Sequence, residues 1–430
     1  MKLLIVGGGA REHALAWKLH RSPRVDLLLC VPGVPSYAVN LPGSLEDLEG
    51  LASMAADNGI DLTVVGPEVQ LAGGIVDLFE ARGLRIFGPT KAAARIESSK
   101  AFAKELMSKY GVPGPDFKVF RDHAQARSTL SKHDGPVVVK ADGLAAGKGA
   151  LVCKDRGEAL QALEECMVTR SFGAAGDTVV LEEYLEGPEV SVFAFSDGAH
   201  ISSLVAACDY KRLLDGDAGP NTGGMGSYSP PEFWTPALAQ QVRDEIMTPV
   251  VAGMATEGSP YRGVLYAGLI LTSQGPKVLE FNCRFGDPET QVILPLLKTD
   301  LVDVFEACID GWVDRLPIEW EDGACAGVVM TSGGYPGEYT IGLPISGLQD
   351  VDHDVQIFHG GTKVVDDAGR TRFLTDGGRV LTVAGLGPTL AEARNRAYEN
   401  LKRIVFEGAQ FRTDIAFTRS AATAGRISHG

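Results

Sequence analysis

Residues 137–149 read VVVKADGLAAGKG, an aliphatic run that passes into a loop of small residues. The run from Val137 to Val139 predicts a buried strand, and Lys140 ends it, where an ammonium group is costly unless an anion meets it. Lys148 stands between two glycines, as in mobile loops that close over a polyphosphate. Gly149 occupies the position where a Walker A loop requires Ser or Thr. The segment therefore predicts a phosphate-binding strand and loop, with two solvated lysines at a hairpin as the alternative.

Residues 277–289 read KVLEFNCRFGDPE and combine a predicted strand with polar side chains. Glu280 and Asn282 are two positions apart, so they lie on one face of that strand. A carboxylate and an amide oxygen suit Mg²⁺, which usually keeps waters and completes its shell from phosphates. Arg284 continues this face, where a guanidinium clamps a transferring phosphoryl group or a carboxylate. With the lysines, these residues predict phosphoryl transfer by positioning and charge neutralisation.

Two other segments have compositions typical of ligand contacts. VVLEEYL at residues 179–185 predicts a strand whose end offers backbone groups to a purine edge, with a carboxylate beyond it for ribose hydroxyls; an ordinary strand end reads the same way. PNTGGMG at residues 220–226 follows Asp209-Tyr210-Lys211-Arg212 and predicts a loop whose backbone approaches a small ligand closely. A flexible surface loop is the alternative for this second segment.

The N-terminus predicts a strand, a glycine turn and a helix, at Leu3–Val6, Gly7–Gly9 and Arg11–Leu19. Such a turn is a candidate phosphate cradle, because backbone amides and a helix N-terminus face the same point. A dinucleotide fingerprint would need a third glycine where Glu12 stands, and an acidic residue near position 31, where the sequence reads VPG. A nucleotide-dependent oxidoreductase is therefore disfavoured, while a monophosphate or sugar-phosphate site and a plain tight turn both stay open.

The alternation of strand and helix patterns predicts a doubly wound parallel α/β domain over residues 1–100. Ser98 and Ser99 are expected to cap a helix that runs to Tyr110 and ends at Gly111. Residues 101–300 predict a mixed α+β domain, and residues 323–418 a smaller α+β domain with a helix at Leu390–Val405. Residues 419–430 predict a frayed tail.

Composition limits the class of protein further. The chain has 430 residues, 45% hydrophobic and 22% charged, which excludes global disorder and a membrane bundle. A net charge of −15 argues against nucleic-acid and anionic-membrane partners. Seven cysteines without a CxxC pair, and the lack of a signal-peptide core or long apolar run, predict a cytoplasmic protein.

The motifs in their order resemble one family over about residues 1–418. They are GGGAREH at 7–13, VVGPE at 64–68, IFGP at 86–89, SSKAF at 98–102, VVVKADGLAAGKG at 137–149, GPNTGGMG at 219–226, LEFNCRFGDPETQ at 279–291, HGGTK at 359–363 and DGGRV at 376–380. This order resembles the phosphoribosylamine–glycine ligase family of the ATP-grasp superfamily. Departures are Ala10 and Tyr210, where the family usually has Gly and His, and Gly268-Leu269, where many ATP-grasp enzymes carry a further acidic metal ligand.

The resemblance implies an ATP-grasp fold with an N-terminal doubly wound α/β domain, a mobile ATP lid over about residues 120–190 and a small C-terminal domain. The implied reaction joins glycine to 5-phosphoribosylamine through glycyl phosphate, with ATP as co-substrate and Mg²⁺ or Mn²⁺ as cofactor, in purine biosynthesis by a monomer. Another ATP-grasp carboxylate–amine ligase of purine metabolism is the alternative. A non-catalytic ATP-binding regulator is disfavoured because Lys148, Glu280 and Arg284 are all present. Biotin carboxylation is disfavoured because nothing in the sequence resembles a biotin carrier.

The resemblance also assigns roles to individual residues. It implies that ATP is bound by Lys100, Lys140, Lys148, Glu182, Glu183, Tyr184, Leu185 and Glu189, the last of these at the ribose. It implies metal ligation by Glu280 and Asn282 and catalytic roles for Arg284, Lys148, Asp209 and Lys211. Near glycine and the acyl phosphate it assigns Asn221, Thr222, Gly223 and Gly224, and near the ribose phosphate Gly8, Gly9, Arg11, Gly66, Pro67, Glu68 and Lys363.

Overall fold

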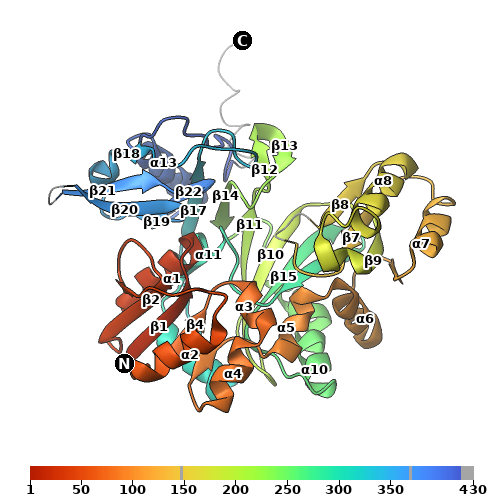
Figure 1. The fold of residues 1–430 in the computed structure, drawn as a ribbon, viewed down its shortest axis with the longest axis horizontal. Helices are drawn as coiled ribbons and strands as arrows, with labels where there is room; N and C mark the ends of the chain where they lie inside the picture. Colours follow the sequence, from red (N-terminus) through yellow and green to blue (C-terminus); the bar gives the residue numbers. More distant parts are fainter. Residues whose placement is uncertain (146–148, 368–369, 418–430) are drawn as a thin grey trace, which may run out of the picture.

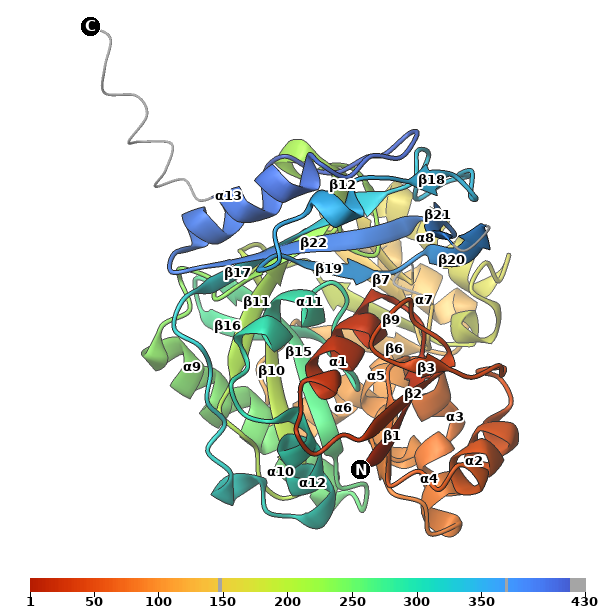
Figure 2. The same cartoon turned by 90° about the vertical axis from the view of Figure 1, so that its left-hand side faces the viewer.

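The structure is a computed structural model that describes residues 1–145, 149–367 and 370–417. It contains a parallel sheet formed by the N-terminal residues, a long antiparallel sheet through the centre and a small antiparallel sheet at one side (Figure 1). Two shorter sheets, of two and three strands, complete it. The parallel sheet lies beside the central sheet, and strands from the C-terminal part of the chain form one end of the central sheet (Figures 1 and 2).

The N-terminal sheet is parallel, with the strand order β3-β2-β1-β4-β5. Its central strand β1 (Lys2–Gly7) is aliphatic and buried because helices cover both faces of such a sheet. This confirms the predicted doubly wound class. The other elements are α1 (Ala10–His20), β2 (Leu27–Pro32), β3 (Val39–Asn40), α2 (Leu48–Asp57), β4 (Leu62–Val65), α3 (Glu68–Gly73), α4 (Ile75–Ala81), β5 (Ile86–Phe87) and α5 (Lys91–Ser98).

The next helix, α6 (Lys100–Tyr110), begins and ends where its caps predict. The Ser99 hydroxyl accepts a hydrogen bond from the Phe102 amide at 3.1 Å, and Gly111 ends the helix with φ +69°. A small module follows, with strand order β6-β9-β7-β8 and a hydrophobic core of its own. Its elements are β6 (Phe117–Phe120), α7 (His123–Leu130), β7 (Val137–Ala141), β8 (Ala150–Cys153), α8 (Arg156–Met167) and β9 (Val179–Glu183). The module projects from one side of the central sheet (Figure 1).

The central sheet has the order β16-β15-β10-β11-β14-β17-β22-β19, with every pair antiparallel. Its strands are β10 (Glu189–Asp197), β11 (Val205–Asp209), β14 (Gly226–Ser229), β15 (Arg262–Thr272), β16 (Gly275–Asn282), β17 (Ala324–Thr331), β19 (Gln356–His359) and β22 (Arg379–Gly387). The remaining strands are β12 (Arg212–Leu214), β13 (Ala218–Asn221), β18 (Pro344–Ile345), β20 (Thr362–Asp367) and β21 (Arg370–Thr375). Because β14 pairs with β17, the strands that follow Gly323 extend this sheet.

Helices cover the central sheet: α9 (Pro236–Val242), α10 (Thr248–Thr256), α11 (Thr290–Ile293), α12 (Leu301–Asp310) and α13 (Leu390–Leu401). The last helix packs along β22 (Figure 2). It ends at Leu401 and not at Val405 as the periodicity predicts, because Val405 pairs with Ser346 in an isolated bridge.

Two motifs that are far apart in the sequence meet where α1 packs against β19. The Trp17 and Phe358 rings make an edge contact at 5.8 Å, and the His359 amide donates to Nδ1 of His13 at 3.1 Å. The other ring nitrogen of His13 lies 2.8 Å from the Ser36 hydroxyl. Burial, and to a lesser extent the neighbouring His359, lower the pKa of His13 well below its ordinary value, which favours the neutral ring that accepts this amide. The interface joins the N-terminal unit to the end of the central sheet.

All seven cysteines are free and buried. Among the residues that the structure describes, no helix is long and apolar enough to cross a membrane.

Candidate active site

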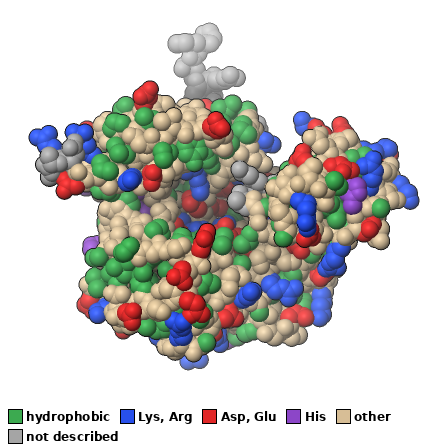
Figure 3. Space-filling view, viewed as in Figure 1, with side chains coloured by type: hydrophobic (Ala, Val, Ile, Leu, Met, Phe, Trp, Pro, Cys, Tyr) green, Lys and Arg blue, Asp and Glu red, His purple; other side chains and the backbone are tan. Residues whose placement is uncertain are grey.

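A cleft of about 550 Å³ opens between the small module, the central sheet and the N-terminal unit. The surface is hollowed there, and acidic and basic side chains gather in the hollow (Figure 3). A second hollow of about 560 Å³ lies beside His200 and Arg243, but the Asp197 carboxylate near it already accepts hydrogen bonds from the amides of Ala199, His200 and Val313. The first cleft is therefore the candidate active site.

Lys140 does lie buried at the end of β7, but it already has an anion. Its Nζ lies 2.8 Å from Oε2 of Glu182 and donates to the Leu279 carbonyl at 3.0 Å. Lys104 of α6 shares the same carboxylate oxygen at 3.3 Å, and burial together with Lys140 lowers the pKa of Lys104 to about 8. Glu182 therefore supplies the anion that a buried Lys140 requires, and a contact of Lys140 with phosphate stays a prediction. The other oxygen of Glu182 is buried without a hydrogen-bond partner.

All but one of the residues predicted to bind ATP line the cleft. Lys100 donates to the Gly143 carbonyl at 2.8 Å, and burial lowers its pKa although Glu280 opposes the shift. Other predicted residues that line the cleft are Lys140, Glu182, Glu183, Tyr184, Leu185 and Glu189. Lys148 lies outside the described residues.

The predicted metal ligands Glu280 and Asn282 both line the cleft at the end of β16. Burial would raise the pKa of Glu280, but the surrounding cations, Lys211 first, lower it below its ordinary value. Opposite Glu280 on β15 stands Gly268, where a Cβ would lie 3.3 Å from Glu280 Cγ. An ionised carboxylate beside an amide oxygen is a donor set that fits a hard divalent cation.

Arg284 links the N-terminal unit to the end of β16. Its Nε donates to Oε2 of Glu68 at 3.2 Å, and its terminal nitrogen lies 3.3 Å from Oε1 of Glu97. Glu97 also accepts a hydrogen bond from the Cys283 amide at 2.7 Å, and burial raises the pKa of Glu97 against the effect of Arg284. Burial alone would lower the pKa of Arg284, but Glu97 and Glu68 raise it, so the guanidinium is held charged in the cleft.

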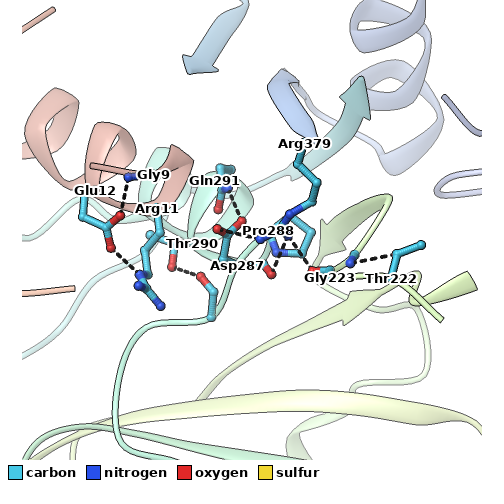
Figure 4. Close-up of polar contacts among 12 residues, drawn as sticks. Gly9, Arg11, Glu12, Thr222, Gly223, Asp287, Pro288, Thr290, Gln291 and Arg379 are labelled. Carbon is cyan, nitrogen blue, oxygen red and sulfur yellow. Dashed lines mark hydrogen bonds and ion pairs between the residues drawn. The ribbon is translucent and has the colours of Figure 1, made fainter. Parts of the chain in front are cut away.

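The glycine turn before α1 surrounds a carboxylate of the protein itself. The Gly9 amide donates to Oε2 of Glu12 at 2.7 Å, and Oε1 of Glu12 accepts from Nε of Arg11 at 2.6 Å (Figure 4). A Cβ at Gly66 would overlap this same carboxylate, so the glycine there makes room for Glu12. The amide of Gly9, a predicted phosphate donor, is therefore already bonded. Of the predicted residues in these turns, Arg11 and Glu68 line the cleft, and Gly8, Gly9, Gly66 and Pro67 do not.

Asp209 and Lys211 face the cleft at the end of β11. Burial raises the pKa of Asp209 to about 7, with Lys211 opposing the shift and Glu289 adding to it. Lys211 lies 2.6 Å from Oε2 of Glu189. Burial would lower the pKa of Lys211, but Asp209 and Glu189 together raise it. The pair combines a carboxyl that titrates near neutrality with a lysine that stays charged.

The loop of residues 221–224 does not offer the backbone donors that its glycines suggest. The Thr222 amide donates to the Lys211 carbonyl at 2.7 Å, the Gly223 amide to the Tyr335 hydroxyl at 2.9 Å, and the Gly224 amide to the Thr222 hydroxyl at 3.0 Å. These three amides are bonded within the protein and are not free donors, and the predicted close approach of a ligand to this loop stays a prediction. Asn221, Thr222 and Gly223 line the cleft, whereas Gly224 does not.

One further predicted residue lies outside the cleft lining, and several residues of the lining were not predicted. Lys363 is exposed on β20 and does not belong to the described cleft lining. The lining includes further charged and polar residues to which no role was assigned: Glu97, Lys104, Tyr266, Asp287, Glu289 and Arg379. Arg379 stands within the quoted DGGRV motif, which is the one signal that pointed to it.

The small module, the central antiparallel sheet and the cationic cleft between them define an ATP-grasp protein. Three family models match the chain: the N domain, the ATP-grasp (A) domain and the C domain of phosphoribosylglycinamide synthetase, at residues 1–97, 98–290 and 325–418. The chain belongs to the phosphoribosylglycinamide synthetase family, which confirms the resemblance found in its motifs. Members of the ATP-grasp class use ATP with a divalent metal ion.

Individual relatives agree with the family. The chain is 48% identical to phosphoribosylamine–glycine ligase of Caldanaerobacter subterraneus subsp. tengcongensis, over 97% of this chain and 99% of that one. It is 46% identical to the protein of the same name from Salmonella typhi, over 97% and 98%. A crystal structure of phosphoribosylamine–glycine ligase from Thermotoga maritima superposes with a TM-score of 0.83 at 33% identity, over 96% of this chain and all of that one. Biotin carboxylase from Campylobacter jejuni, with a TM-score of 0.73, 13% identity and coverage of 95% and 92%, shares the fold alone.

Proposed function

We propose that the protein joins glycine to 5-phosphoribosylamine at the expense of ATP, giving glycinamide ribonucleotide, ADP and phosphate in purine biosynthesis. The observation that carries this proposal is the family match along nearly the whole chain, together with a cleft where cations surround Glu280. Phosphoryl transfer to a carboxylate brings several negative charges together, and such a cleft neutralises them.

In the proposed complex, the phosphates of ATP lie against Lys100, Lys140 and Lys148. The adenine lies along Glu182 to Leu185, and Glu189 contacts the ribose. Support comes from the cleft lining, which includes every one of these residues that the structure describes. The unpartnered oxygen of Glu182 is an acceptor suited to an exocyclic amine.

Glu280 and Asn282 would hold Mg²⁺, or Mn²⁺ in its place, and the ion would neutralise charge on the phosphates of ATP. Around them, Lys140, Lys211 and Arg284 reduce the repulsion between the nucleotide and the carboxylate of glycine.

The first step forms a bond between a carboxylate oxygen of glycine and the γ-phosphorus while the bond to the ADP oxygen breaks. Arg284 orients and stabilises the transferred phosphoryl group. In the second step the amine of 5-phosphoribosylamine attacks the acyl carbon, its proton passes to Asp209, and phosphate leaves. Lys211 stabilises the negative charge that develops on the acyl oxygen.

The ribose phosphate of 5-phosphoribosylamine is assigned to Arg11, Glu68 and the turns at Gly8–Gly9 and Gly66–Pro67. Arg11 has the strongest support, because it lines the cleft and is oriented by Glu12. Lys363 has the least support, since it is exposed on β20.

The rate of the ligase reaction is expected to rise with pH through about 7, because Asp209 accepts a proton only as the carboxylate. Asp209→Asn should lower kcat by about 100-fold and flatten this acidic limb. The measurement is kcat from pH 5.5 to 9, with the exposed Asp244→Asn as the control. An Asp209→Asn enzyme that keeps the acidic limb would exclude Asp209 as the base.

The proposed function is tested by ADP release from ATP and Mg²⁺ in the presence of glycine, with and without 5-phosphoribosylamine made in situ from ribose 5-phosphate and ammonia. Turnover that needs both co-substrates, with one ADP per amide formed, establishes the ligase. ADP release that ignores both co-substrates contradicts it, and other carboxylates are then the substrates to screen.

We also propose that the enzyme acts as a cytoplasmic monomer built of domains at about residues 1–100, 101–300 and 323–418, with the small module as its ATP lid. Seven buried, unpaired cysteines support a reducing compartment. Sedimentation of the purified protein tests the monomer.

A further inference from the structure

Arg379 reaches the cleft from β22, in the C-terminal part of the central sheet (Figure 4). One terminal nitrogen donates to the Gly223 carbonyl at 2.5 Å and to the Asp287 carbonyl at 3.0 Å. Its other terminal nitrogen lies 3.0 Å from Oδ2 of Asp287. Oδ1 of Asp287 in turn accepts a hydrogen bond from Gln291 at 2.8 Å, so the carboxylate is fixed on both oxygens. The guanidinium thus connects two loops that are distant in the sequence.

The glycines of the loop fit this guanidinium closely. A Cβ at Gly223 would lie 3.1 Å from Cζ of Arg379 and 3.3 Å from the Tyr335 hydroxyl. At Gly224, φ is +111° and a Cβ would overlap Pro288. The amides of this loop are bonded within the protein, and its glycines allow the close approach of Arg379, Tyr335 and Pro288.

The loop is held from two sides. The Thr222 amide and hydroxyl both donate to the Lys211 carbonyl, at 2.7 and 2.9 Å, which ties the loop to the strand end that carries Asp209. Arg379 and Tyr335 hold Gly223 from the other side. Loss of the Arg379 contacts therefore frees one side of the loop, which lines the same cleft as Asp209 and Lys211. The part of the lining that belongs to β7 and β9 does not depend on these contacts.

We infer that Arg379 is a positioning residue of the ligase, which holds the loop of residues 221–224 against Asp287 so that the glycine-binding wall of the cleft is formed before substrate arrives. This inference rests on the proposed function, and on the family resemblance that assigns residues 221–224 to glycine and the acyl phosphate. It gives the C-terminal part of the chain a role in binding glycine that is separate from the binding of ATP.

The test compares KM for glycine with KM for ATP in Arg379→Gln and Arg379→Lys. A lost charge-assisted hydrogen bond weakens an interaction by about 10-fold or more, so KM for glycine should rise by at least about 10-fold in Arg379→Gln while KM for ATP stays within about twofold. Arg379→Lys keeps the charge but loses the two-pronged geometry and should fall between. Arg396→Gln is the matched control, because Arg396 pairs with Asp354 at 2.5 Å on the surface of the same C-terminal part, and its kinetics should be unchanged.

A second variant disturbs the contact between Arg379 and Gly223 by changing the glycine. Gly223→Ala introduces a Cβ against the Arg379 guanidinium and should raise KM for glycine to a similar extent. Combined with Arg379→Gln it should add little, because both changes break one contact. It also carries the test if Arg379→Gln fails to fold.

The outcomes separate the two proposals. If the wild-type protein shows no glycine-dependent ADP release, the proposed function fails and the inference falls with it. If the wild type is active but the Arg379 variants match it, raise both KM values equally or lower kcat alone, only the inference is overturned. Strictly additive effects of Gly223→Ala and Arg379→Gln would overturn it as well.

Discussion

Arg284→Met is expected to lower the rate of acyl phosphate formation by about 100- to 1000-fold. The guanidinium lies in the cleft beyond the end of β16, and removing one donor that stabilises developing charge has effects of this size. Single-turnover release of ADP with glycine in excess measures this step directly. Arg284→Lys retains the charge but cannot reach Glu68 and Glu97 with two separate nitrogens, so it should recover only part of the rate.

Arg284→Met is also expected to lower the free energy of unfolding by about 3–5 kcal/mol, because it leaves the buried Glu97 without its cation. Arg284 is the main group that opposes the upward shift of the Glu97 pKa. Urea denaturation at pH 7 measures the loss. Adding Glu97→Gln to Arg284→Met should restore part of the stability but none of the activity. Recovery of activity in the double variant would contradict the catalytic role of Arg284.

Glu280→Gln is expected to raise the Mg²⁺ concentration needed for half-maximal turnover by about 100-fold and to lower kcat at saturating metal. The substitution keeps the shape of the side chain but removes the negative charge that Lys211, Lys140 and Lys100 surround. It therefore leaves an excess of positive charge where a cation has to bind.

The measurement is a titration of turnover with Mg²⁺ and, in parallel, of Mn²⁺ binding by electron paramagnetic resonance, which does not depend on activity. Glu321→Gln removes a carboxylate that pairs with Lys298 at the surface and should leave both titrations unchanged. An unaltered metal titration in Glu280→Gln would remove Glu280 from the metal site.

The local patterns of the sequence predicted most of the elements that build the site. The run at Val137–Lys140 forms β7, the Ser99 and Gly111 caps limit α6, and Glu280 and Asn282 share one end of β16. Each of these features depends on neighbours within a few residues, through side-chain alternation, capping hydrogen bonds or the conformational freedom of glycine. The order of the motifs was also enough to predict the family, because a motif is recognised from the sequence without knowledge of the fold.

What the tertiary structure alone decided is which groups are already satisfied within the protein. Lys140 is paired with Glu182, Arg284 is paired with Glu68 and Glu97, and the loop at Gly223 is held by Arg379. A sequence states that a lysine is buried or that a loop is rich in glycine, but the partner comes from a segment tens or hundreds of residues away. Such pairings follow from how sheets and helices pack, and the cost of burying an unpaired polar group then selects the contacts that form.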